Sequence, residues 1–380
     1  MSNLLVSFKE SVKLSDKFLW LIIFLISGFS LALMKSVSLE GMNYFNIQLI
    51  AMTAGLTGAF IISAIDYRIL ADKWIWIGIF CVLMIVYTLF FGISVEGSSG
   101  VNARAWINIP GGITFQPSEL VKIGFIITFS KHLSIIIEKN KITSFWNMIL
   151  VVIHALIPVI LTHLQGDDGA AIIFLCMAVF MSFISGIQLR YFALALSLGV
   201  LMLPLAWKYV LADYQKQRII NQLNPESDPL NMGYQQIQGK LSIASGGFSG
   251  YGLFRGPRVA NGAVPIQESD FIFSVAGEEL GFLGCMSILI LLVLLLLRVI
   301  YIAKKSCDNI GTIMCFGFLG LVLSQMIFNI GMCLSLLPVM GVTLPFFSAG
   351  GSSSACLYLG IGLIQSVFAH RQKSVVKKEK

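Results

Sequence analysis

Long apolar stretches separated by short polar links run through almost the whole chain. A helix needs about 20 mainly apolar residues to cross the hydrocarbon core of a membrane. Stretches of this kind occur at 18–36, 44–64, 74–94, 117–137, 145–163, 169–188, 191–212, 271–301, 310–336 and 345–369. We therefore predict an all-α polytopic membrane protein with ten transmembrane helices.

The composition agrees with this class and limits the number of domains. Hydrophobic residues make up 57% of the 380 residues and charged residues only 12%, whereas charged residues make up about 25% of typical soluble domains. No polar segment except 213–270 is long enough to bury a core of its own, and that segment has few aliphatic residues. We predict one membrane domain, residues 1–380.

The links differ in their content of lysine and arginine, which indicates orientation. Most of the 26 basic residues fall in alternate links and near the two chain ends, and cytoplasmic links carry such an excess. We predict that both termini are cytoplasmic. Residues 213–270, between the seventh and eighth helices, then form a large extracytoplasmic loop, which we call the outer segment. The net charge of +7 fits an inner-leaflet rim and requires no nucleic acid.

The outer segment is the place where chemistry outside the membrane is expected. Four of its basic residues run against the inside bias and are suited to an anionic ligand such as a phosphate group: Arg218, Lys240, Arg255 and Arg258. The glycine-rich stretch 245–252 allows the backbone to approach a bulky ligand closely, although a flexible solvated loop is an alternative. A nucleotide site is not indicated, because no strand precedes the glycines and no Gly-Lys-Ser/Thr follows.

Ionisable residues within the predicted helices are costly and indicate functional or structural sites. Glu119 and Lys122 lie on one helix face and predict either a mutual ion pair or a contact with substrate headgroups. Asp167 and Asp168 are adjacent carboxylates at an outer boundary, where they raise each other's pKa, hold a cation or form an ordinary solvated link. Glu278 falls on roughly the same helix side as Asp270. The seven cysteines imply no disulfide framework and no CxxC metal site.

Several short motifs occur in an order that resembles one known family. They are Gln116-Pro117-Ser118-Glu119, Gln165-Gly166-Asp167, Asn224-Pro225-Glu226-Ser227-Asp228-Pro229, Ser245-Gly246-Gly247, Asp270-Phe271-Ile272-Phe273, Glu278-Glu279-Leu280-Gly281, Leu344-Pro345 and Ser348-Ala349-Gly350-Gly351-Ser352. This order is similar to that of the SEDS proteins of bacterial wall synthesis, from about the third predicted helix to the end of the chain. Residues 213–218 and 226–227 resemble the elongation members more than the division members.

The resemblance implies ten spans and a peptidoglycan glycosyltransferase. Such an enzyme polymerises lipid II at the outer face of the bacterial cytoplasmic membrane, here during cell elongation. A class B penicillin-binding transpeptidase is the implied partner, within the elongation machinery. Asp270 stands at the position of the family's essential carboxylate. Our candidate substrate-binding residues are Arg104, Glu119, Lys122, Asp167, Arg218, Lys240, Glu278 and Ser348.

The chemistry of glycan polymerisation suits a carboxylate at the membrane edge. An acceptor sugar hydroxyl loses a proton as it attacks the anomeric carbon, so Asp270 is a suitable general base. The departing diphosphate lipid gathers negative charge, which Arg or Lys side chains or a divalent cation (Mg²⁺ or Mn²⁺) stabilise. Inversion at the anomeric carbon needs a single displacement. No cofactor beyond such a cation is expected.

Some residues depart from the family pattern. Family members commonly have His-Thr where this chain has Glu268-Ser269, a second Arg at Ala105, Pro at Gly166 and Tyr at Ala349. These differences leave the proposed base intact, and the acid Glu268 is expected to raise the pKa of Asp270 by repulsion between like charges.

Two other functions fit parts of the sequence. A flippase for lipid II would use the intramembrane charges Glu119, Lys122 and Glu278, but paired broken helices typical of many transporters are not evident. A non-catalytic scaffold for the transpeptidase is compatible with the changed residues beside Asp270. A flippase would move lipid II without lengthening glycans, and a scaffold would tolerate substitution of Asp270.

Overall fold

The structure, a computed structural model, describes residues 14–38, 44–96, 102–109, 113–142, 144–223 and 232–371. Within these ranges, nine helices are long and apolar enough to cross a membrane. They are α2 (Lys17–Val37), α3 (Tyr44–Ala64), α5 (Trp74–Phe91), α6 (Pro117–Glu138), α7 (Phe145–Leu164), α9 (Leu189–Leu205) with its π-helical continuation Ala206–Val210, α13 (Ile272–Lys305), α14 (Asn309–Cys333) and α15 (Gly351–Ala369). The chain is therefore a multi-pass membrane protein.

The sixth predicted span corresponds to a shorter helix. Helix α8 (Asp168–Ile184) has 17 residues, which at about 1.5 Å per residue gives a length near the lower limit for crossing the hydrocarbon core. The short helix α4 (Tyr67–Asp72) joins α3 to α5 and begins where Asp66 accepts a hydrogen bond from the backbone N–H of Arg68.

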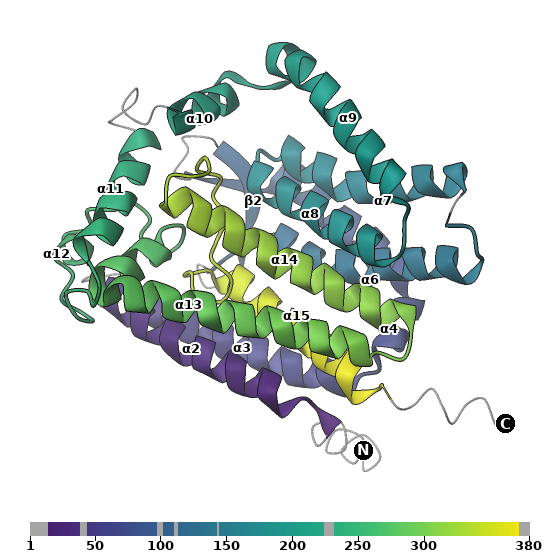
Figure 1. Cartoon of the computed structure of the whole chain (residues 1–380), viewed down its shortest axis with the longest axis horizontal. Coiled ribbons are helices and arrows are strands. Elements are labelled where there is room, and N and C mark those ends of the chain that lie inside the picture. The colour runs from purple at the N-terminus through teal and green to yellow at the C-terminus, as the bar shows by residue number, and fades with distance from the viewer. Residues whose placement is uncertain are drawn as a thin grey trace.

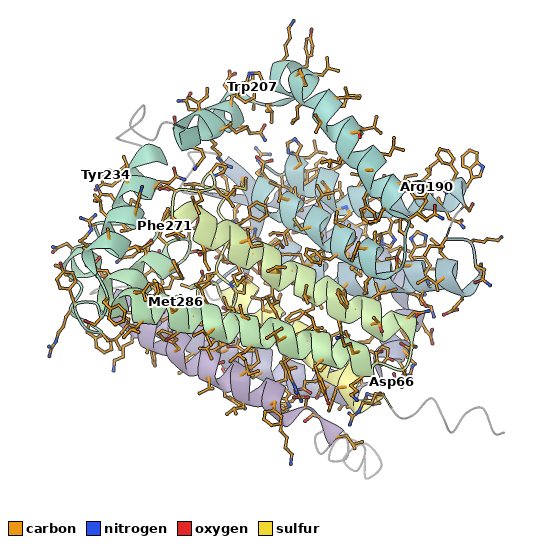
Figure 2. All side chains as sticks on the ribbon, in the orientation of Figure 1. Asp66, Arg190, Trp207, Tyr234, Phe271 and Met286 are labelled. Atoms are coloured by element: carbon orange, nitrogen blue, oxygen red, sulfur yellow. The ribbon has the colours of Figure 1, made fainter. Side chains whose placement is uncertain are left out.

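The helices pack around a core formed by α6, α14 and α15, which have the most buried residues in proportion to their length. Helix α15 packs along α3, α14 along α8, and α13 against both α14 and α2 (Figure 1). Helix α9 differs from all of these because none of its residues is buried. Figure 2 shows side chains projecting from every side of this helix between Arg190 and Trp207. Lipid is the expected neighbour of such a helix.

A small antiparallel sheet, which the all-α prediction missed, joins α5 to α6. Its strands are β1 (Ile93–Glu96), β2 (Asn102–Ile109) and β3 (Ile113–Phe115), in the order β1-β2-β3. In the register of β2 and β3, Ile107 pairs with Phe115. The strands are too short and too polar to be found by a search for long apolar stretches. The sheet lies over the end of the bundle that also carries the outer segment (Figure 1).

The outer segment is mostly helical where it is described. It contains α10 (Asp213–Leu223), α11 (Met232–Ser245) and α12 (Pro257–Ala260). The family-like motif at 224–229 lies outside the described residues. In Figure 1, α11 and α12 lie at the edge of the bundle next to the first turns of α13, and α10 lies farther from α13, beyond α11.

The glycine-rich stretch packs against a break in α13. Gly281 has φ 64° and ψ −156°, so the carbonyl groups before it and the N–H groups after it lack helical partners. The stretch supplies these partners: Gly252 N donates to Glu279 O at 2.8 Å, and Phe282 N donates to Gly247 O at 2.9 Å. A Cβ atom at Gly250 would lie 2.1 Å from Glu279 O. The glycines therefore permit a close approach to α13 rather than to a ligand.

This arrangement predicts that Gly281 is essential for stability. Its conformation is nearly exclusive to glycine, and a Cβ atom there would lie 2.4 Å from Gly250 N. We expect Gly281→Ala to lower the free energy of unfolding by about 3 kcal/mol, combining backbone strain with overpacking. Thermal denaturation of the protein in detergent measures the change. Gly28→Ala is the control, because a Cβ atom there meets nothing within 4 Å. Equal melting temperatures for the two variants would contradict this account.

Candidate active site

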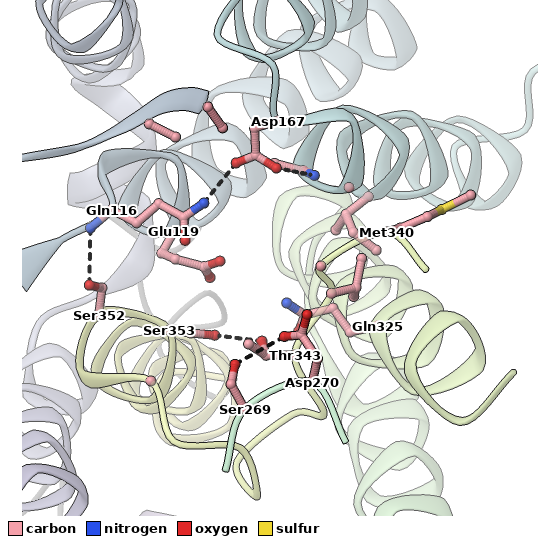
Figure 3. Close-up of a pocket in the computed structure, with 18 of the residues that line it drawn as sticks. Gln116, Glu119, Asp167, Ser269, Asp270, Gln325, Met340, Thr343, Ser352 and Ser353 are labelled. Atoms are coloured by element: carbon pink, nitrogen blue, oxygen red, sulfur yellow. Dashed lines mark hydrogen bonds between the residues drawn. The ribbon is translucent and has the colours of Figure 1, made fainter. Parts of the chain in front are cut away.

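A cavity of about 280 Å³ lies at the end of the bundle that carries the sheet and the outer segment. Residues from β2, α6, α8, α10, the turn before α13, α14 and the 340–353 segment line it. Figure 3 shows that its polar side chains converge from several helices, with Glu119 and Asp167 on one side and Asp270 on the other. Segments far apart in sequence thus meet around one space.

Asp270 is held in place through the backbone of its turn. Its side chain lines the cavity although the residue is only 6% exposed. The Asn329 amide donates from Nδ2 to the carbonyl oxygens of Asp270 and Val342, each at 2.8 Å. Ser348 Oγ donates to Ser269 O at 2.6 Å. The carboxyl group is therefore fixed relative to α14 and to the segment that follows it.

The surroundings of Asp270 raise the pKa of its carboxyl group. Burial raises the pKa of this carboxyl to about 6, the hydrogen bond from Ser269 Oγ at 3.0 Å opposes the rise, and the negative charge of Glu268 adds to it. The effect expected of Glu268 is confirmed in direction, although burial is the larger cause. A carboxylate with such a pKa is a better base than an exposed aspartate and is still mostly ionised at neutral pH.

Glu119 and Lys122 form the predicted ion pair. Lys122 Nζ lies 2.8 Å from Glu119 Oε1, and both side chains are buried. Both residues also line the cavity. The two readings of this pair are therefore compatible, since the ion pair faces the same space as Asp270.

Asp167 and Asp168 hold neighbouring elements. Asp167 accepts from Ala170 N at 2.9 Å, capping α8, and from Gln116 Nε2 at 2.7 Å. Burial raises the pKa of Asp167. Asp168 lies 2.7 Å from His163 Nδ1 and accepts from Gln215 Nε2 at 2.7 Å, which ties α10 to α8.

The donor set does not match a preformed divalent-cation site. In the described ranges, no three His, Cys, Asp or Glu residues come together so that they could hold a metal ion. The cavity carboxylates are also engaged, Glu119 by Lys122 and Asp167 by Gln116 and the start of α8.

Comparison with known proteins assigns the family. The family model described as cell cycle protein FtsW/RodA/SpoVE matches residues 14–373. This chain belongs to that family. Peptidoglycan glycosyltransferase MrdB of Escherichia coli K12 is 31% identical over 357 residues, which is 94% of each chain. Stage V sporulation protein E of Bacillus subtilis is 33% identical over 329 residues, 84% of this chain and 85% of that protein.

Solved structures agree with this assignment. A chain of a peptidoglycan synthase complex that coordinates polymerization and crosslinking matches with a TM-score of 0.81 and 29% identity, covering 95% of this chain and 99% of that one. The rod shape determining protein RodA of Thermus thermophilus matches with a TM-score of 0.70 and 25% identity, covering 94% and 98%. The FtsW/RodA/SpoVE fold therefore extends over nearly the whole chain.

The cavity of this FtsW/RodA/SpoVE member gathers some of the predicted substrate-binding residues and leaves out others. Glu119, Lys122, Asp167, Arg218 and Asp270 line it. Arg218 on α10 is the basic residue that the outer segment contributes to the lining set. The departures from the family pattern at Ala105, Gly166 and Ala349 also fall on the cavity wall.

Four predicted residues are not among those that line the cavity: Arg104, Lys240, Glu278 and Ser348. Lys240 is exposed on α11, and Arg104 is exposed on β2 between two lining residues. Glu278 Oε1 accepts from the backbone N–H of Arg258 at 2.6 Å and of Val259 at 3.3 Å, so it caps α12. Ser348 contacts the turn that carries Asp270, through its hydrogen bond to Ser269 O.

Several polar lining residues were not singled out from the sequence. Gln325, Thr343, Ser352 and Ser353 line the cavity, and Thr343 and Ser353 share a hydrogen bond at 3.2 Å between their hydroxyl oxygens. A lone amide within an apolar span was the available signal for Gln325. Hydroxyl residues are too common near helix ends to stand out.

Because Glu119 and Lys122 form a buried ion pair, removing one charge should destabilise the protein more than removing both. Lys122→Met leaves Glu119 buried without its partner, which costs about 3–5 kcal/mol. Glu119→Gln combined with Lys122→Met removes both charges, so most of the stability should return. Thermal denaturation measures both variants. A single variant as stable as the double variant would show that the pair is not energetically coupled.

Proposed function

We propose that this chain, a peptidoglycan glycosyltransferase of the FtsW/RodA/SpoVE family, polymerises lipid II with Asp270 as the general base. The observation that supports this most directly is the buried Asp270 carboxyl, which faces a cavity also lined by Lys122 and Arg218. A base and two cations around one space match a reaction in which a hydroxyl loses a proton while a diphosphate departs.

In this mechanism, Asp270 accepts the proton of the acceptor sugar hydroxyl as that oxygen attacks the anomeric carbon of the donor. The bond from this carbon to the diphosphate breaks in the same displacement, which inverts the configuration. Arg218 and Lys122 stabilise the charge on the departing diphosphate. The backbone hydrogen bonds from Asn329 hold the base in place, so little reorganisation accompanies proton transfer.

The proposal includes a topology. Helix α8 is the sixth of ten spans, both termini are cytoplasmic, and the outer segment 213–270 faces the outside of the bacterial cytoplasmic membrane. The whole of residues 1–380 acts as one membrane domain. Grouping of the sheet, the outer segment and the cavity at one end of the bundle supports a reaction at a single membrane face.

We also propose a class B penicillin-binding protein as partner, within the cell elongation machinery. The support is the likeness to a chain from a peptidoglycan synthase complex that joins polymerization with crosslinking. Helix α9, none of whose residues is buried, offers an apolar surface within the membrane.

Polymerisation of purified lipid II tests the assignment. We expect the wild-type protein, alone or with its transpeptidase partner, to yield glycan strands visible on gels, and Asp270→Asn to reduce the rate by at least about 100-fold, the lower range for loss of a general base. Asn keeps the size of the side chain and can still accept from Ser269, so the fold should persist.

Glu268→Gln serves as the matched control, because it removes a neighbouring carboxylate and keeps Asp270. We expect it to remain active. Equal rates for Asp270→Asn and wild type would exclude Asp270 as the base. Transfer of labelled lipid II across vesicles without longer glycans would instead indicate a flippase.

A further inference from the structure

One buried amide faces the cavity with an oxygen that lacks a partner. Gln325 on α14 is 1% exposed and lines the cavity. Its Oε1 has no hydrogen-bond partner in the part of the chain that the structure describes. An unpaired buried acceptor costs about 1–3 kcal/mol, so an apolar residue would be more stable at this position. A ligand that donates a hydrogen bond would account for the amide.

The residue one turn further along α14 shows how a buried amide is satisfied when its role is internal. Asn329 is fully buried and donates to two backbone carbonyl groups, those of Asp270 and Val342. Positions four apart lie on the same side of a helix. The same face of α14 therefore carries one amide used to hold Asp270 and one amide left open toward the cavity.

The cavity's own charged groups do not supply the missing donor. Asp270 acts as a base only in its carboxylate form, which accepts hydrogen bonds and cannot donate one. Lys122 Nζ donates to Glu119 Oε1 at 2.8 Å, and within the described ranges it makes no hydrogen bond to Gln325 Oε1. Figure 3 shows the Gln325 side chain beside the carboxyl group of Asp270, at the same end of the cavity.

The chemistry of the amide restricts what it can bind. An acceptor oxygen repels an anionic phosphate, so the diphosphate belongs with Lys122 and Arg218 instead. Sugar hydroxyl groups are uncharged and donate hydrogen bonds. If Asp270 receives the proton of the attacking hydroxyl, the hydroxyl next to it on the sugar ring is the donor that would come within reach of Gln325.

We propose that Gln325 is a substrate-positioning residue that accepts, through Oε1, a hydrogen bond from the acceptor-sugar hydroxyl adjacent to the attacking one. This inference rests on the proposed function. The contact fixes the rotation of the sugar ring about the attacking oxygen and thereby aligns that oxygen with Asp270. It also discriminates in favour of acceptors that carry both hydroxyl groups, since an acceptor lacking the second one leaves the amide oxygen unpaired.

The test pairs Gln325→Leu with a synthetic lipid-linked acceptor in which the adjacent hydroxyl is replaced by hydrogen. With the native acceptor, Gln325→Leu should lower kcat/KM by about 10-fold, equivalent to about 1.4 kcal/mol. The deoxy acceptor should cause a similar loss with the wild-type enzyme. It should cause little further loss with Gln325→Leu, because that variant already lacks the hydrogen bond that the deoxy acceptor cannot make.

Thermal denaturation separates this role from a structural one. Removing an unpaired oxygen should leave the melting temperature of Gln325→Leu unchanged or higher. The control is Gln365→Leu: Gln365 on α15 is fully buried outside the cavity, and its amide exchanges two hydrogen bonds with the Asp16 backbone at 2.8 and 2.9 Å. That variant should melt at a lower temperature.

Three results would overturn the inference: wild-type rates for Gln325→Leu, losses that multiply when the variant meets the deoxy acceptor, or a fall in melting temperature like that of Gln365→Leu. If these appear while wild type lengthens glycans and Asp270→Asn does not, the proposed function stands and only the role of Gln325 fails. If wild type produces no glycan, both fail together.

Discussion

The two hydrogen bonds that Asn329 donates hold together the part of the molecule on which the rest of the site depends. They join the Asp270 turn and the segment after α14 to one point inside the bundle. A buried carboxyl is costly, and its turn would move toward water without such a restraint. Because the restraint acts on backbone carbonyl groups, the Asp270 side chain remains free to face the cavity. The Asp270 carboxyl group can therefore be buried and still face the cavity.

The outer segment depends on a second set of backbone contacts. The break at Gly281 leaves α13 with unpaired polar groups, and the stretch 245–252 pairs with them. Glu278 then caps α12, and Gln267 Nε2 donates to Val259 O at 3.1 Å within the chain leading to Asp270. The segment that carries the base is therefore anchored at both ends, on α13 and on α14. Contacts made outside the cavity thereby position the segment that forms part of its wall.

The sequence predicts the helices well because crossing a membrane is a local property of length and hydrophobicity. The same search missed the sheet at 93–115, whose strands are short and half polar. Asp270 could be found through the order of motifs, and Glu119 with Lys122 through their helical spacing. The function of Glu278 could not be predicted from the sequence, because only tertiary packing brings it to its hydrogen-bond partners, the backbone N–H groups of residues 258 and 259. Likewise, spacing alone does not show that Arg218 lines the cavity while Lys240 does not, or that Gln325 Oε1 has no hydrogen-bond partner among the described residues.

The pH dependence of kcat/KM for lipid II polymerisation, measured on the purified enzyme, tests most directly whether Asp270 is the base. A base must be deprotonated to act, and burial raises the pKa of this carboxyl to about 6. We expect a rate that is nearly constant above pH 7 and falls about tenfold per pH unit well below pH 6. A rate unchanged between pH 5 and pH 8 would contradict it.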